Sequence, residues 1–267
     1  MDIYILKLSA CLLAFWLLYV LLLEKQGTHQ FKRFYLLGSL LVSAVIPLMT
    51  ITTYIDPSSL TETSLTVQNE SIVDASQIQR ESAPINDLIS LVWIVYSLGA
   101  ALFSLRFLIN LIRLIQKIIT HKQITSTPFI YVLLTKSITP HSFFNYLFFS
   151  KTAYESKDIP NEVFAHEKAH ANQLHTLDII FIELLQIALW FNPLIYLIKH
   201  HIKLNHEFLA DQAVLNNGVN SIKYQNILLE YLSNQQQFQL SSTINYSSIK
   251  KRIIIMKTHR SKRRDLI

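Results

Sequence analysis

Residues 166–170 read His-Glu-Lys-Ala-His, and here the side-chain types and their spacing point most directly to chemistry. On a helix, His166 and His170 project from the same face about one turn apart. Two imidazoles at this spacing can bind one zinc ion, and Glu167 then lies beside the position where a water molecule would bind. The motif therefore predicts a zinc site in which Glu167 is the general base.

A catalytic zinc site also needs a third protein ligand and an open coordination position. Further along the chain, Glu207 and Asp211 are spaced so that they share one face of a second helix. If this helix packs antiparallel to the first, Glu207 completes a set of two histidines and one glutamate. Asp211 can then accept a hydrogen bond from a ligand histidine such as His166, as carboxylates often do beside metal-bound imidazoles. His206 is the rival ligand, but it lies about 100° around the helix from Glu207.

Two polar residues between these motifs allow more than one interpretation. Asp178 either supports the metal ligands or caps the helix expected from Leu177 to Phe191, and the residues alone favour neither. His175 is expected at the protein surface and not at the metal.

The composition places this site in a membrane protein. Hydrophobic residues make up 51% of the chain and charged residues 16%, whereas soluble domains carry about 25% charged residues. The formal net charge is +6, but the basic residues flank apolar runs and form no aromatic-interleaved patch. We therefore expect contact with a lipid bilayer and no direct nucleic-acid binding. The single cysteine, Cys11, excludes a disulfide framework within this sequence.

Three apolar runs are long enough to cross a bilayer as helices, at about residues 4–23, 34–53 and 88–109. The third run continues as a more amphipathic helix to about residue 119. The first run is too long for the core of a signal peptide, and no small-residue cleavage site follows it. We therefore expect three transmembrane helices, the first of them uncleaved.

Loop charges predict the orientation of these helices. The first loop and the segment after the third run are basic, whereas the loop at residues 54–87 is mostly acidic and polar. Basic flanks face the cytoplasm. We therefore expect the N-terminus and residues 54–87 outside, and everything after the third run inside.

Residues 120–267 have a different, mixed character. Strands are expected at residues 128–135 and 142–149, and a helix from about residue 156 through His170. The apolar stretch from Leu177 to Ile202 could pass for a fourth span, but polar residues interrupt it. Asn192-Pro193 also predicts the end of one helix and the capped start of another. We expect a buried or partly membrane-embedded helical hairpin, which keeps Glu207 on the same side as His166.

Together these elements resemble the BlaR/MecR-type membrane metallopeptidases, an antirepressor and sensor-transducer family. The resemblance covers nearly the whole chain. It rests on the three apolar runs, Ser142-Phe143-Phe144, His166-Glu167-x-x-His170, Asp178, Trp190-Phe191-Asn192-Pro193, Glu207-x-x-x-Asp211 and Ile249-Lys250-Lys251-Arg252-Ile253. The family pattern continues with a fourth apolar run, and often with a sensor domain. The 267 residues contain neither after Arg252, so we expect either a short member of the family or a truncated sequence.

The resemblance implies a mainly α membrane protein in the bacterial cytoplasmic (inner) membrane. Residues 1–119 would form the transmembrane region, and residues 120–267 a cytoplasmic α+β gluzincin-like zinc peptidase domain. It implies one Zn²⁺ per chain, held by His166, His170 and Glu207.

The implied activity is peptide-bond hydrolysis, and the implied partner is a cytoplasmic transcriptional repressor that the enzyme cleaves or inactivates. The substrate would add a strand to a sheet edge, for which Ser142, Phe143 and Phe144 begin the best candidate. For the residue that stabilises the oxyanion, Tyr154, His201 and His206 are weak candidates.

Two other functions fit parts of the pattern. A membrane quality-control protease would share the site but have no dedicated repressor partner. A signal-transducing receptor or scaffold would keep the zinc site only as a vestige. Glu167 argues against the scaffold, because a structural zinc site needs no general base.

Overall fold

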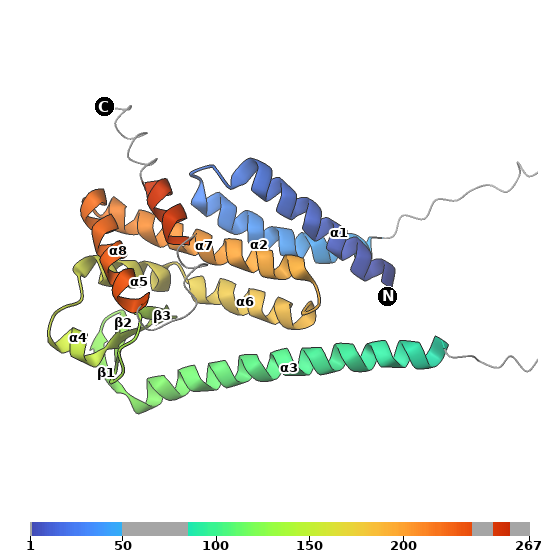
Figure 1. Ribbon diagram of the computed structural model, residues 1–267, viewed down its shortest axis with the longest axis horizontal. Helices are drawn as coiled ribbons and strands as arrows, with labels where there is room; N and C mark the ends of the chain where they lie inside the picture. Colours follow the sequence, from blue (N-terminus) through green and yellow to red (C-terminus); the bar gives the residue numbers. More distant parts are fainter. Residues whose placement is uncertain (1, 50–84, 237–247, 257–267) are drawn as a thin grey trace, which may run out of the picture.

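The computed structural model describes residues 2–49, 85–236 and 248–256 (Figure 1). The loop predicted at residues 54–87 lies outside these ranges except for residues 85–87, and the predicted second span lies outside them beyond Met49.

Three helical segments are long and apolar enough to cross a membrane, as the sequence predicts. The first, Ile3–Leu23, combines α1 (Asp2–Leu18) with the π-helical turn η1 (Tyr19–Leu23). The second, His29–Leu48, combines α2 (His29–Val45) with the 3-10 turn η2 (Ile46–Leu48). The third, Ser90–Thr120, is most of α3 (Ile85–Thr120).

The second segment begins before the predicted residue 34. Its polar first turn is helical because the side chains there find partners inside the protein. Lys32 is fully buried, and its Nζ donates a hydrogen bond to the backbone oxygen of Glu24 at 2.8 Å.

Helices α6 (His175–Ala188) and α7 (Pro193–Asn216) form the predicted hairpin instead of a single span. The side chain of Asn192 caps α7 by accepting a hydrogen bond from the backbone N–H of Leu194 at 3.0 Å. Pro193 follows at the first helical position, where its missing N–H costs nothing. The hairpin therefore turns at Asn192 because a capping residue and a proline stand together there.

The hairpin packs against α1 and α2 through one apolar core (Figure 1). This core contains Leu8, Leu12, Tyr19, Leu36, Leu40, Ile182, Ile195, Ile198 and Ile202. At the hairpin tip, Asn192 Nδ2 donates to Ser9 Oγ at 3.0 Å, and Trp190 Nε1 donates to the backbone oxygen of Tyr96 at 3.2 Å. A Cβ on Gly99 would lie 2.2 Å from the Trp190 ring, so α3 approaches the tip closely. The tip thus lies level with residues inside the first and third candidate spans.

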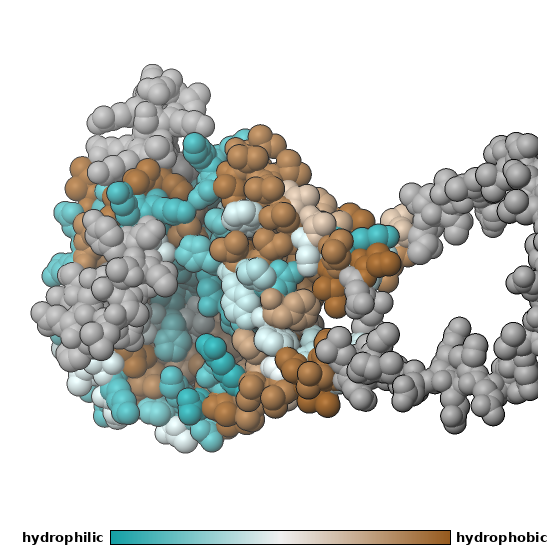
Figure 2. Space-filling view, turned by 45° about the vertical axis from the view of Figure 1, so that its right-hand side comes forward, coloured by the Kyte–Doolittle hydropathy of each residue, from teal (hydrophilic) through white to brown (hydrophobic). Residues whose placement is uncertain are grey.

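Apolar side chains remain exposed along α3 and on the outer faces of α1, η1 and α2. Examples are Ile3, Leu6, Leu21, Leu41, Leu91, Ile94, Leu98, Leu102, Leu105 and Ile112. Figure 2 shows hydrophobic residues, in brown, gathered mainly over the upper and right-hand parts of the surface in this view. Exposed apolar surface on this scale marks contact with a partner or with lipid, and the length of these helices favours lipid.

A four-stranded sheet follows α3, in the order β1-β2-β4-β3. Its strands are β1 (Lys122–Ser126), β2 (Phe129–Leu134), β3 (His141–Phe143) and β4 (Tyr146–Ser150). Strands β2 and β4 are parallel, and the two outer strands each pair antiparallel with their neighbour. β2 matches the strand predicted at residues 128–135.

The single strand predicted at residues 142–149 is wrong. Phe144 adopts a positive φ of 49°, and Phe144 and Asn145 form a turn that divides the segment into β3 and β4. A residue in this left-handed conformation cannot continue an extended strand. β3 therefore folds back and becomes the edge of the sheet.

The remaining helices surround the sheet and the hairpin. They are α4 (Lys151–Glu155), α5 (Asn161–Asn172), α8 (Ser221–Gln236) and a short helix at residues 248–256. α5 begins after Pro160, later than predicted, and packs against α6, α7, β3 and β4. It therefore lies between the sheet and the hairpin.

Candidate metal centre

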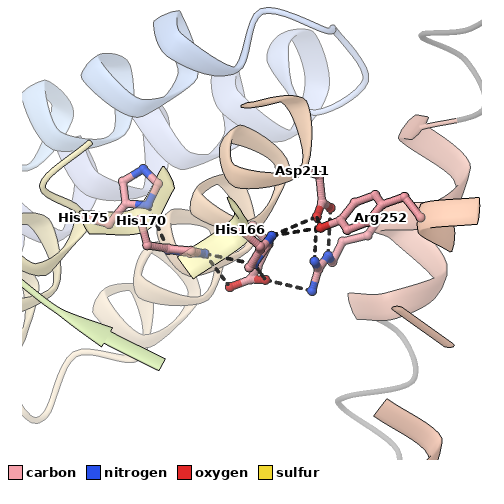
Figure 3. Close-up of polar contacts among 7 residues, drawn as sticks. His166, His170, His175, Asp211 and Arg252 are labelled. Atoms are coloured by element: carbon pink, nitrogen blue, oxygen red, sulfur yellow. Dashed lines mark hydrogen bonds and ion pairs between the residues drawn. The ribbon is translucent and has the colours of Figure 1, made fainter. Parts of the chain in front are cut away.

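His166 and His170 on α5 face Glu207 on α7. The two Nε2 atoms of the histidines lie 3.1 Å apart (Figure 3). Glu207 Oε2 is 3.4 Å from His166 Nε2, and Glu207 Oε1 is 3.7 Å from His170 Nε2. One ligand atom from each residue lies within 4.8 Å of the other two, so this group could hold a metal ion.

The chemistry of this donor set fits a metal. Both imidazoles direct a ring nitrogen into the same space beside a carboxylate, and a pair of nitrogens 3.1 Å apart can share only one proton. Two nitrogens and one carboxylate oxygen are also the ligands of several catalytic zinc sites. The residues present therefore fit a metal cofactor at this position.

His166 is oriented by a chain of polar groups on its other side. Its Nδ1 lies 2.9 Å from the hydroxyl of Tyr224, which donates to Asp211 Oδ1 at 2.7 Å. Asp211 Oδ1 is also 3.4 Å from His166 Nδ1. The structure thus brings Asp211 to His166 as the sequence suggested, and it adds Tyr224 of α8, which nothing in the sequence marks.

His170 is oriented by His175, whose Nδ1 lies 3.0 Å from His170 Nδ1 (Figure 3). The prediction that His175 lies at the surface is wrong, because only 3% of this residue is exposed. Leu174 adopts a left-handed conformation with φ 53°, which turns the chain between α5 and α6 and returns His175 to the site. If His170 binds a metal through Nε2, its Nδ1–H donates to His175.

Asp178 reaches the same site through two stacked histidines. Its Oδ2 accepts from Arg33 at 2.6 Å and lies 2.7 Å from His206 Nε2. The ring of His206 stacks on His175 with 4.0 Å between centroids. The cap position of α6 is Leu174, so the structure separates Asp178 from the capping role that the sequence left open.

Glu167 is 8% exposed and lines a cavity of about 310 Å³ together with the three candidate ligands. Burial raises the pKa of Glu167 to about 7, and a hydrogen bond from Ser142 opposes that rise. A carboxylate whose pKa lies near neutrality can both accept and return a proton.

The two histidines differ in protonation. Burial lowers the pKa of His170 to about 4. Burial acts the same way on His166, but hydrogen bonds to Asp211 and Glu207 outweigh it and raise the pKa to about 9. In the metal-free protein, His170 is therefore neutral and His166 is protonated at pH 7.

Arg252 is a further buried residue of the site, which the sequence marked only as part of the resembling stretch Ile249-Lys250-Lys251-Arg252-Ile253. Its Nε and Nη2 donate to the two carboxylate oxygens of Asp211 at 2.8 and 2.6 Å, and its Nη1 lies 2.8 Å from Glu207 Oε2. Although burial opposes the effect, this guanidinium helps to hold the pKa values of Asp211 and Glu207 below their usual range.

The three weak candidates for oxyanion stabilisation do not line the cavity. Tyr154 packs against Tyr131 and Phe164, His201 against Trp16 and Tyr19, and His206 bonds to Asp178. Tyr231 of α8 does line it, beside the ligands and Glu167.

The candidate substrate edge is only partly as predicted. Ser142 and Phe143 lie in β3, which is one of the two edge strands of the sheet and packs beside α5. Phe144 lies in the following turn, and its backbone N–H donates to Thr176 Oγ1 at 2.9 Å.

A family comparison matches this part of the chain. Residues 149–256 match the family model of the BlaR1 peptidase M56. The matched segment contains α5 to α8 and the helix at residues 248–256, and so all the candidate ligands, Glu167 and Arg252. No curated protein matches the chain. The resemblance to the BlaR/MecR-type peptidases is thereby confirmed over residues 149–256, which are similar to the BlaR1 peptidase M56 family, a family of metallopeptidases.

Proposed function

We propose that this protein is a membrane zinc endopeptidase. The observation that carries the proposal is the convergence of His166 Nε2, His170 Nε2 and the Glu207 carboxylate beside the buried carboxyl group of Glu167. In this proposal His166, His170 and Glu207 hold one zinc ion. Asp211 orients His166 directly and through Tyr224. Asp178 supports His170 through His206 and His175.

When bound, zinc supplies a water molecule of lowered pKa and polarises the scissile carbonyl. Glu167 would take a proton from the attacking water on a carboxylate oxygen and return it to the leaving nitrogen. Its raised pKa suits both transfers, since the group is neither a strong acid nor permanently protonated at neutral pH. β3, with Ser142 and Phe143, would bind the substrate backbone as an added strand and so align the scissile bond beside Glu167 and the candidate ligands.

The three apolar helices and the family match support a membrane location. We propose that the peptidase domain faces the cytoplasm of a bacterial cell, because the loop between the first two spans is basic. In that setting the substrate is a cytoplasmic transcriptional repressor, cleaved or inactivated in response to a signal at the membrane.

Removal of Glu207 tests the metal site directly. Wild-type protein purified in detergent should contain about one zinc per chain, because a complete three-ligand set with an open position binds zinc tightly. Glu207→Ala should lose most of this zinc in the same metal analysis. Glu155→Ala removes an exposed carboxylate outside the site and should keep the metal. Wild-type protein that takes up no zinc would contradict the proposal.

Zinc affinity should depend on pH, because binding of one zinc ion should release one proton from His166. His166 must lose its proton before Nε2 can bind the metal, and its pKa is about 9. His170, with a pKa of about 4, is already neutral above pH 5, and the Glu207 carboxylate is already ionised. The apparent affinity should therefore rise about tenfold per pH unit between pH 6 and 8 and level off above about pH 9. Competition with a chelator of known proton affinity measures this slope, and a flat profile would show that zinc binding displaces no proton from His166.

A further inference from the structure

The helix at residues 248–256 places one buried guanidinium between two carboxylates of α7. Arg252 is 7% exposed and makes three contacts of 2.6 to 2.8 Å, two with Asp211 and one with Glu207. Asp211 in turn orients His166, and Glu207 is the candidate third ligand. A single side chain therefore touches both residues through which α7 contributes to the metal centre (Figure 3).

From this arrangement we infer that Arg252 is the positioning residue of the metal ligand Glu207. Its Nη1 holds Oε2 of that carboxylate at 2.8 Å, which leaves Oε1 directed toward His170. The inference rests on the proposed zinc site. We add that Arg252, from the separate helix at residues 248–256, is needed to fix Glu207 as the third ligand.

The geometry of arginine suits this task. Its planar fork presents several N–H groups in fixed directions, so it can bind one carboxylate with two bonds and still donate to another. A lysine ammonium is a point charge on a flexible stem and cannot fix both groups at once. A free glutamate side chain loses rotamer freedom when it binds a metal, and Arg252 removes part of that cost beforehand.

The position of Arg252 does not depend on Glu207. The neighbouring Lys251 Nζ binds Glu24 Oε1 at 2.9 Å, at the end of the first candidate span. Ile253 and Met256 of the same helix pack with Val214 and Tyr224. Because apolar packing and a separate ion pair hold the helix, the guanidinium is the fixed partner and the Glu207 side chain is the one that it orients.

Zinc affinity of Arg252→Gln, Arg252→Lys and Lys250→Gln tests the inference, measured by chelator competition on the full chain in detergent. Arg252→Gln should bind zinc about 10- to 100-fold more weakly, the range found when a residue that supports a metal ligand is replaced. Arg252→Lys keeps the charge but loses the fork, so its affinity should fall between that of Arg252→Gln and the wild type. Lys250 is an exposed cation on the same helix, and Lys250→Gln should leave the affinity unchanged.

Thermal unfolding of the metal-free variants separates positioning from folding. If Arg252→Gln folds, an affinity equal to or tighter than that of the wild type overturns the inference. If it does not fold, Arg252→Lys decides: weaker zinc binding by a folded protein supports the inference, and unchanged binding overturns it. Wild-type protein that binds no zinc would overturn the proposed function itself. Equal zinc binding by the wild type and Arg252→Gln would overturn only the inference about Arg252.

Discussion

Glu167→Gln should lower the rate of peptide hydrolysis by about 10²- to 10⁴-fold, the usual contribution of a general base. Glutamine has nearly the same shape as glutamate, but its amide could not act as a base toward the attacking water. Glu167 is not one of the three residues whose ligand atoms converge, so the variant should keep its zinc. The measurement is cleavage of a peptide library or of the co-expressed substrate, at equal zinc content.

Glu162→Gln is the matched control for this variant. Glu162 is another buried carboxylate of α5, but it pairs with Lys223 at 2.7 Å and does not line the cavity. Its replacement should leave hydrolysis within a few-fold of the wild-type rate. Equal activity of Glu167→Gln and wild type would assign the base to another group and remove Glu167 from the proposed mechanism.

Asp178→Ala should destabilise the folded protein by about 3–5 kcal/mol, as expected when one partner of a buried ion pair is removed. Asp178 holds Arg33 at 2.6 Å, and their side chains are only 8% and 13% exposed. The same carboxylate lies 2.7 Å from His206. Its loss would leave a guanidinium without a counter-charge between α2 and α6.

Thermal unfolding in detergent measures this effect, and a double-mutant cycle with Arg33→Ala isolates it. The double variant should be more stable than the sum of the two single losses implies, because no charge is then left unpaired. Glu155→Ala, at an exposed i,i+4 pair, should cost under about 1 kcal/mol. Equal unfolding temperatures for Asp178→Ala and Glu155→Ala would show that the buried contact contributes nothing to stability.

The parts of the site that the sequence predicts are those that depend on local geometry. His166 and His170 share a face of one helix, and Glu207 and Asp211 share a face of another, whatever else the chain does. The hairpin is predicted for a similar reason, since the cap and the proline at Asn192-Pro193 stand side by side.

The parts that the sequence misses depend on contacts between distant segments. Arg252 is 41 residues from Asp211, and Tyr224 is 58 residues from His166. In the sequence one is part of a basic run and the other an isolated tyrosine. Only the packing of α8 and of the helix at residues 248–256 on α7 brings them to the candidate metal centre.

Backbone turns explain the remaining differences. His175 is buried because Leu174 adopts a left-handed conformation, and the expected strand divides because Phe144 does the same. Leucine and phenylalanine are rare in that conformation, where glycine or asparagine would have given a signal. Neither turn can therefore be predicted from the residue types at these two positions.

Because the hairpin tip is anchored, α7 fixes the distance between that tip and Glu207. Asn192 is fixed to Ser9 inside the first candidate span, and α7 runs from there without a break to Glu207. At about 1.5 Å per residue, the tip and Glu207 are about 22 Å apart along the helix axis. Since a bilayer core is about 30 Å thick, we expect that a tip level with Ser9 in a membrane-spanning helix would place Glu207 close to one membrane surface. Substrate selection would then depend partly on the position of the scissile bond, because that bond has to reach the site close to the membrane surface.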